Sequence, residues 1–442
     1  DRPAVLRPAS DSAAWVFTKE AGLTPVTATT EGASGSASVV VLPRVFLPGD
    51  ISAMPGLDAG ADVTCAAITL GRTYCWGASG AGQLGPSADS VCFGTVQDSL
   101  GQPLPGEVSK SCSLAPVRLS SDLSFAGLAV GRTSACGITL AGQLYCWGAN
   151  DQGQLGNGLA GASAAPTLVT GAFAFRSVVV GGQHACALTT DGAAYCWGSD
   201  AMGQLGDART ISSTTPIPVV ADTLTGRTVR FTALSAGLAH TCGISTEGVT
   251  YCWGDNAWGQ LGATTAQRCG NVSCSSVPVP VNVPVNTRFA ALTAGADHTC
   301  ALTDAGAAYC WGNDSTGQLG DRASNSTRPT PVPVFGGHVF RQITAGTRYT
   351  CALDGTAAWC WGDDADLQLG RGPYSGGDAF TASPVMVAGG HAFERISAGL
   401  RHTCAVTVDG HAFCWGSNVF GALGNTLQAA YRGIPQEVAT PR

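Results

Sequence analysis

The chain has 442 residues, enough for a large core or for two or three domains. Charged residues make up only 12% of it and 60 residues are glycine, a balance that excludes disorder and favours short strands joined by tight turns. The net charge is −7 and the only lysines are Lys19 and Lys110, so no basic cluster exists for nucleic acid. The sequence lacks a run of about 18 apolar residues, so we expect no membrane span.

The 18 cysteines indicate an oxidising compartment. Their number is even and 14 of them recur at one spacing, as in a disulfide framework. The chain begins without an apolar leader, so we expect any signal peptide to have been removed. Sequons at Asn271, Asn313 and Asn325 fit export, although three matches in a Ser/Thr-rich chain are close to chance. We expect an extracellular or cell-surface protein.

Residues 1–43 lack the pattern of the rest of the chain. The segment 26–41 alternates on both sides of a Gly/Ser stretch, which predicts a β-hairpin. It resembles the last two strands of a bacterial immunoglobulin-like domain with a Thr-Ala-Thr-Ser-Glu-Gly hairpin. The segment is too short for a sandwich core. It therefore folds onto the remaining chain, belongs to a truncated domain, or exchanges strands with another subunit through Val26, Ala28, Val39 and Val41.

One pattern recurs seven times after residue 44: an apolar run, a Cys, about nine residues, and Cys-Trp-Gly. A turn rich in Asn and Asp follows, then Gly-Gln-Leu-Gly and a Pro/Val segment. The paired cysteines are Cys65/Cys75, Cys136/Cys146, Cys186/Cys196, Cys242/Cys252, Cys300/Cys310, Cys351/Cys360 and Cys404/Cys414.

The third copy shows why these cysteines pair. Residues 184–189 alternate as a strand does, Asp191-Gly192 is a turn, and Ala194 begins the returning strand, so Cys186 and Cys196 face each other across a hairpin. Zinc is the rival interpretation, but zinc ligands come in closely spaced knuckles and not nine residues apart. We predict seven cross-strand disulfides, with Cys92–Cys112 and Cys269–Cys274 pairing within two loop insertions.

From about residue 45 to 442 the chain resembles the regulator-of-chromosome-condensation repeat family, whose signature includes His-Thr/Ser, an Asp-Gly turn, Tyr-x-Trp-Gly and Gly-Gln-Leu-Gly. The resemblance implies an all-β fold: a seven-bladed β-propeller of four-stranded blades (residues 44–442), here with an N-terminal β-hairpin extension (residues 1–43). We expect the two termini of the propeller to meet in one blade. The doubled cysteines and the acidic charge argue against the nuclear roles of the family, and suggest a secreted bacterial type.

Two groups of residues suggest a metal-binding site, and both can be explained by a structural role. A His precedes Thr/Ala-Cys in four copies, at positions that we expect to be half-buried and bonded to a neighbouring blade: His184, His240, His298 and His402. Three acids lie in one turn, where Asx side chains cap turns without an ion: Asp363, Asp364 and Asp366. We predict no metal and no cofactor.

The residue before Gly-Gln-Leu-Gly differs from copy to copy. In chain order it is Ala81, Gln152, Met202, Trp258, Thr316, Asp366 and Phe420. Large apolar residues at surface turns usually need a reason, so Trp258, Met202 and Phe420 are candidate partner-binding residues. The loops after these turns also carry the two insertions, residues 86–115 and 263–276. The alternative is that the side chains pack under those loops.

The sequence favours a structural or interaction protein over an enzyme, because no Ser/His/Asp or Cys/His nucleophile set can be assembled and nothing marks a pair of carboxylates. The favoured function is a filament or surface-assembly subunit that self-associates into a homopolymer through its N-terminal strands. A second hypothesis is a secreted binder such as an enzyme inhibitor, since the resembling family includes a bacterial inhibitor of β-lactamases. The third hypothesis is an enzyme that acts on polysaccharides.

Overall fold

The computed structural model describes residues 56–67, 72–85, 90–97, 103–119, 121–220, 229–372, 379–427 and 430–441, and the backbone of four strands before residue 41. The chain divides into two compact units, residues 1–50 and 51–442. The predicted domain boundary after residue 43 and the candidate assembly residue Val41 lie outside the described residues.

The first unit contains two small antiparallel pairs: β1 (Pro8–Ala9) with β2 (Ala13–Ala14), and β3 (Leu23–Thr30) with β4 (Ala33–Val40). The second pair is the hairpin that the alternation predicted. The last pair of its register is Thr30 with Ala33, and the Gly/Ser stretch lies in β4. The register pairs Val26 with Ala37 and Ala28 with Gly35.

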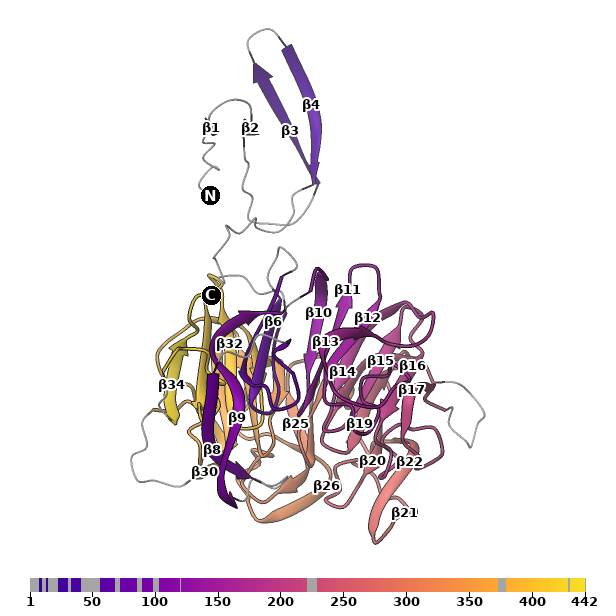
Figure 1. Ribbon diagram of the computed structural model, residues 1–442. Helices are drawn as coiled ribbons and strands as arrows, with labels where there is room; N and C mark the ends of the chain where they lie inside the picture. The colour runs from indigo at the N-terminus through magenta and orange to yellow at the C-terminus, as the bar shows by residue number, and fades with distance from the viewer. Residues whose placement is uncertain are drawn as a thin grey trace. The chain divides into compact units, whose positions relative to one another are not determined.

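The second unit is a ring of seven antiparallel sheets, one for each copy of the repeat (Figure 1). Blade one has β5 (Gly56–Ala59), β6 (Val63–Ala67), β7 (Thr73–Ala78), β9 (Pro103–Arg118) and an added β8 (Ser90–Gln97). Blade two has β10 (Phe125–Val130), β11 (Ser134–Thr139), β12 (Leu144–Gly148) and β13 (Ser163–Leu168). Blade three has β14 (Phe175–Val180), β15 (His184–Thr189), β16 (Ala194–Gly198) and β17 (Ser213–Pro218).

The remaining blades follow in the same order. Blade four has β18 (Phe231–Ala236), β19 (His240–Ser245), β20 (Thr250–Asp255), β22 (Val272–Pro280) and an added β21 (Arg268–Cys269). Blade five has β23 (Phe289–Ala294), β24 (His298–Thr303), β25 (Ala308–Asp314) and β26 (Ser326–Pro333). Blade six has β27 (Phe340–Ala345), β28 (Tyr349–Asp354), β29 (Ala357–Asp363) and β30 (Phe380–Met386). Blade seven has β31 (Phe393–Ala398), β32 (His402–Thr407), β33 (Ala412–Ser417) and β34 (Tyr431–Glu437).

A disulfide joins the second and third strands of every blade. In blade four the register places Cys242 directly opposite Cys252, with Cα atoms 4.0 Å apart. The two insertions hold Cys92–Cys112 and Cys269–Cys274, so the structure joins the cysteines in the predicted pairs. The other bridges are Cys65–Cys75, Cys136–Cys146, Cys186–Cys196, Cys300–Cys310, Cys351–Cys360 and Cys404–Cys414.

Each blade is tied to the one before it by the tryptophan that follows the second cysteine. Trp253 is fully buried and its Nε1 donates to the main-chain oxygen of Gln204 in blade three, at 2.9 Å. A buried donor that lost this acceptor would leave a costly unpaired group. The same bond recurs around the ring. The donors are Trp147, Trp197, Trp311, Trp361 and Trp415, and the accepting main-chain oxygens are, in the same order, those of Gln83, Gln154, Gln260, Gln318 and Gln368.

The ring closes without a shared blade. Blades one and seven lie side by side (Figure 1), where Trp76 Nε1 donates to the oxygen of Ala422 at 2.9 Å and Thr64 Oγ1 lies 2.8 Å from His402 Nε2. The prediction that both termini meet in one blade is wrong, because blade one comes wholly from residues 56–118 and blade seven from 393–437. The buried contacts between whole blades replace an exchanged strand. No helix suited to crossing a membrane is found in the part of the chain that the structure describes.

Candidate functional site: the turn face

The turns after the third strands lie together on one face of the ring, which we call the turn face. Its variable residues are those before Gly-Gln-Leu-Gly: Ala81, Gln152, Met202, Trp258, Thr316, Asp366 and Phe420. In blade four the Asn256 side chain accepts the main-chain N–H of Leu261 at 3.1 Å, as the Asx interpretation predicted. The equivalent caps are Asn150, Asp200, Asp314, Asp364 and Asn418.

The glutamine of the tetrapeptide fixes six of the seven turns from inside. The side-chain oxygen of Gln260 accepts the N–H of Trp258 at 2.9 Å, and its main-chain oxygen accepts from Trp311 and from the Thr299 hydroxyl of blade five. Sequence reasoning missed this role, although the recurrence of glutamine in six of the seven copies was the available signal. The backbone of the turn is therefore held in place while the side chain at the variable position is free to differ.

The three candidate partner-binding residues differ in their exposure to solvent. Trp258 is 39% exposed, the most exposed tryptophan among the described residues, and Met202 in the preceding blade is half-buried. Phe420 is only 1% exposed, so the prediction that it faces a partner is wrong. The inserted hairpin β8–β9 covers it: the ring packs on the Cys92–Cys112 bridge, and Lys110 Nζ lies 4.5 Å from the ring centroid.

The turn of one blade lies beside the loop that enters the second strand of the following blade. Thr316 in blade five donates to the oxygen of Arg348 in blade six at 3.0 Å, and Asp366 in blade six lies 3.6 Å from Arg401 in blade seven. The turn face is thus assembled by pairs of adjacent blades.

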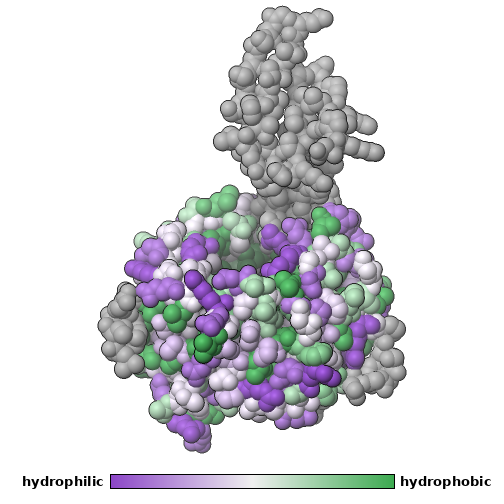
Figure 2. Space-filling model, turned by 180° about the vertical axis from the view of Figure 1, so that it is seen from behind, coloured by the Kyte–Doolittle hydropathy of each residue, from purple (hydrophilic) through white to green (hydrophobic). Residues whose placement is uncertain are grey.

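The two halves of the turn face differ in chemistry. Blades three and four present Met202 and Trp258, whereas the seam of blades six, seven and one is closed by Arg401, which lies between Asp62 and Asp366 at 3.3 and 3.6 Å. Burial raises the pKa of Asp366 to about 6, opposed by the positive charge of Arg401. On the face that Figure 2 shows, apolar and polar side chains are interspersed.

The histidines are buried structural residues, more deeply than the half-buried placement that we expected. Nε2 of His240 lies 3.0 Å from the Thr299 hydroxyl of the next blade, and burial lowers the pKa of His240 to about 3. His184, His298 and His402 make the same contact with Thr241, Thr350 and Thr64. These rings stay neutral at physiological pH.

The acidic turn of blade six is likewise structural. Asp364 caps Leu369 at 3.0 Å and pairs with Arg371 at 2.6 Å, and Asp363 pairs with Arg348 at 3.1 Å. Over the described residues, no group of three His, Cys, Asp or Glu side chains is arranged to hold a metal ion.

Two of the sequons lie at the surface and one does not. Asn271 and Asn325 are exposed, whereas Asn313 is buried and its side-chain oxygen accepts the N–H of Ser315 at 2.8 Å.

A family model described as RCC1-like domain matches residues 89–442. The ultraviolet-B receptor UVR8 of Arabidopsis thaliana is 32% identical over 213 residues, which cover 48% of this chain and 46% of the receptor. Human WBSCR16 superposes with a TM-score of 0.69 at 21% identity, covering 83% of this chain and 94% of that one. Yeast RCC1 (Prp20), solved bound to Kap60, superposes with a TM-score of 0.67 at 19% identity, covering 87% of this chain and 85% of that one. The two solved structures show the fold alone, and the match spans less than half of the receptor's length.

Proposed function

Because the chain belongs to the RCC1-like domain family, a family of protein-interaction propellers, we propose that it is an extracellular protein-binding propeller that holds its partner on the turn face. The observation that carries the proposal is Trp258, a large aromatic side chain held 39% exposed on a rigid turn. Exposed tryptophans on fixed backbone are typical of the residues that dominate protein interfaces. Half-buried Met202 on the adjacent blade extends the apolar area.

The disulfides support the extracellular location. The seven bridges of the repeat are fully buried, and two more close the insertions. Disulfides persist in oxidising compartments and are rare in the cytosol. Yeast RCC1 was solved with Kap60 bound, which provides an example of a protein partner on this fold.

Binding is favoured over catalysis by the contacts of the titratable side chains. The four buried histidines are bonded to threonines of the neighbouring blade, and the cysteines are joined in disulfides. Asp364 and Asp366 are paired with arginines. These groups stabilise the propeller through contacts with neighbouring residues.

The test uses the immobilised chain to capture proteins from the extracellular material of its native source. We expect the wild-type chain and the variant Val285→Ser to retain the same partner. Val285 is a 91% exposed apolar residue in the loop between β22 and β23, and not at a variable turn position. Trp258→Ser should lower the affinity for that partner at least tenfold. Equal retention by Trp258→Ser would contradict a turn-face site.

A second candidate function, a subunit of a self-assembling polymer, is favoured by the N-terminal hairpin. β3 and β4 form a sheet of only two strands, and such a ribbon is marginally stable alone. Strands from another copy could complete it through Val26, Ala28, Val39 and Val41. Deletion of residues 1–43 should then yield a folded, disulfide-bonded monomer that no longer assembles in electron micrographs and sedimentation. Assembly of the truncated chain would contradict this role.

A further inference from the structure

The channel at the centre of the ring is lined by the first strand of every blade. One position in these strands faces the first cysteine of the repeat across the ladder, as Ser235 faces Cys242. Its seven occupants are Asp58, Ala129, Val179, Ser235, Thr293, Thr344 and Ser397. The cavity that they surround has a volume of about 490 Å³, within the range of small-molecule sites.

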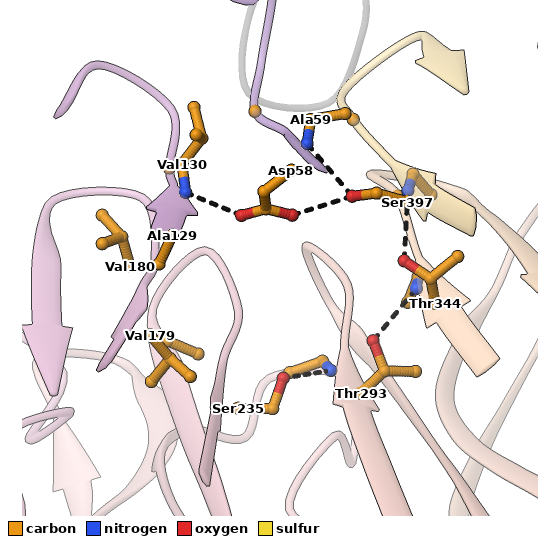
Figure 3. A pocket seen from close by; sticks show the side chains of 18 of the residues that line it. Asp58, Ala59, Ala129, Val130, Val179, Val180, Ser235, Thr293, Thr344 and Ser397 are labelled. Carbon is orange, nitrogen blue, oxygen red and sulfur yellow. Dashed lines mark hydrogen bonds between the residues drawn. The ribbon is translucent and has the colours of Figure 1, made fainter. Parts of the chain in front are cut away.

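At five of the seven junctions, the side chain at this position accepts a main-chain N–H of the next blade (Figure 3). Ser235 accepts from Ala294 at 2.9 Å and Thr293 from Ala345 at 3.0 Å. The other acceptors are Thr344 from Ala398, Ser397 from Ala59, and Asp58 from Val130. The side chains therefore form a belt of hydrogen bonds that links successive blades.

The belt is interrupted at two consecutive junctions. Ala129 and Val179 stand where the other blades have an acceptor, and their side chains cannot accept a hydrogen bond. The main-chain N–H groups at the matching positions of the next blades belong to Val180 and Ala236. The register repeats from blade to blade, so these N–H groups point toward the channel as that of Ala294 does. The result is a gap beside the apolar side chains of Ala129, Val179 and Val180 (Figure 3). At this gap the belt supplies no acceptor for the N–H groups of Val180 and Ala236.

The rest of the belt also offers donors. The Ser397 hydroxyl donates to Asp58 at 2.8 Å, but within the described part of the chain the hydroxyls of Ser235, Thr293 and Thr344 have no acceptor. Both oxygens of Asp58 accept a bond, from Ser397 and from Val130. Arg132 and Arg395 line the same cavity.

We propose that the channel binds a small organic carboxylate, whose oxygens accept the N–H groups of Val180 and Ala236 and whose apolar part lies against Ala129 and Val179. Donors in excess of acceptors suit an anion. The methyl groups of the wall suit a short branched aliphatic chain. The site lies in the channel and not on the turn face, so its failure leaves partner binding untouched.

The probes are isovalerate, the uncharged isovaleramide, and a tetrapeptide ending in valine with a free or amidated carboxyl end. Calorimetry and saturation-transfer NMR on the full chain should show binding of isovalerate, at least tenfold tighter than of isovaleramide. Tighter binding of the free-acid peptide than of isovalerate would assign the carboxylate to the end of a partner's chain, and the reverse order to a free metabolite. Absence of binding by all four probes would mean that the channel holds water only, and would overturn the proposal.

Matched substitutions locate the site in the gap. Val179→Thr supplies an acceptor for Ala236 N–H and should weaken isovalerate binding at least tenfold. Thr293→Val removes the acceptor of the Ala345 N–H, at a junction outside the gap, and should change the affinity for isovalerate less than twofold. Thr and Val already occupy this position in different blades, so both variants should fold, which their melting temperatures will verify. Equal weakening by the two substitutions, or none by Val179→Thr, would contradict the proposed site.

Discussion

Two tryptophans five residues apart in blade four have opposite roles. Trp253 is 0% exposed and bonds to Gln204 of the preceding blade, whereas Trp258 is 39% exposed at the variable position of the turn. The first has an equivalent in all seven copies and the second in none. The difference shows how this segment of the repeat divides its residues: the tryptophan that joins blades is constant, whereas the residue before Gly-Gln-Leu-Gly varies.

The largest effect should come from the constant tryptophan. Trp253→Ala removes a fully buried indole and leaves the Gln204 oxygen with one donor fewer, so the free energy of unfolding should fall by about 3–5 kcal/mol. Trp258→Ser should change it by less than about 0.5 kcal/mol, because surface substitutions away from packed contacts cost little. Denaturant unfolding of both variants measures the contrast. A loss of several kcal/mol for Trp258→Ser would identify a buried packing role and contradict the proposed site.

A smaller effect should follow removal of one repeat disulfide. The double variant Cys242→Ala, Cys252→Ala frees a hairpin loop of 10 residues, which should lower the free energy of unfolding by about 2–3 kcal/mol. Peptide mapping of the wild-type chain without reductant should find nine bridges in the pairs described and no free thiol. Bridges between different blades would contradict the repeat architecture.

The smallest effect concerns Asp314, a turn cap whose position is held by Asn in three other copies. Burial raises the pKa of Asp314 from 3.8 to about 7, and its Oδ2 has no partner among the described residues. Because this pKa is higher in the folded chain, the carboxyl's contribution to stability is complete below about pH 4 and is lost as the pH rises through about 7.

Asp314→Asn should therefore raise the melting temperature by a few degrees at pH 8 and change it less at pH 4. Asn150 already fills this place in blade two, where its side-chain oxygen makes the same cap at 3.0 Å. Val285→Ser serves as the surface control, with no pH-dependent change expected. A variant that is less stable than the wild type at pH 8 would contradict the assignment of a buried, poorly solvated carboxyl.

The sequence was sufficient to predict the features that recur in each copy of the repeat. The disulfide pairs, the Asx caps and the blade architecture follow from spacings that recur within about 50 residues. Phe420 could not be placed, because the hairpin that covers it is inserted in blade one, more than 300 residues earlier in the chain. The channel belt was missed for a related reason: each hydrogen bond joins two copies, and its signal is a single Ser or Thr in a strand.

The central claim is that the variable turn residues bind a partner while the constant residues hold the ring. The most direct measurement is the affinity of the captured partner for the double variant Met202→Ser, Trp258→Ser, with Val285→Ser as the control and unfolding curves recorded in parallel. The account predicts at least a tenfold loss of affinity with unchanged stability, and no loss for the control. Unchanged affinity of the double variant, or a loss of affinity that only accompanies unfolding, would contradict it.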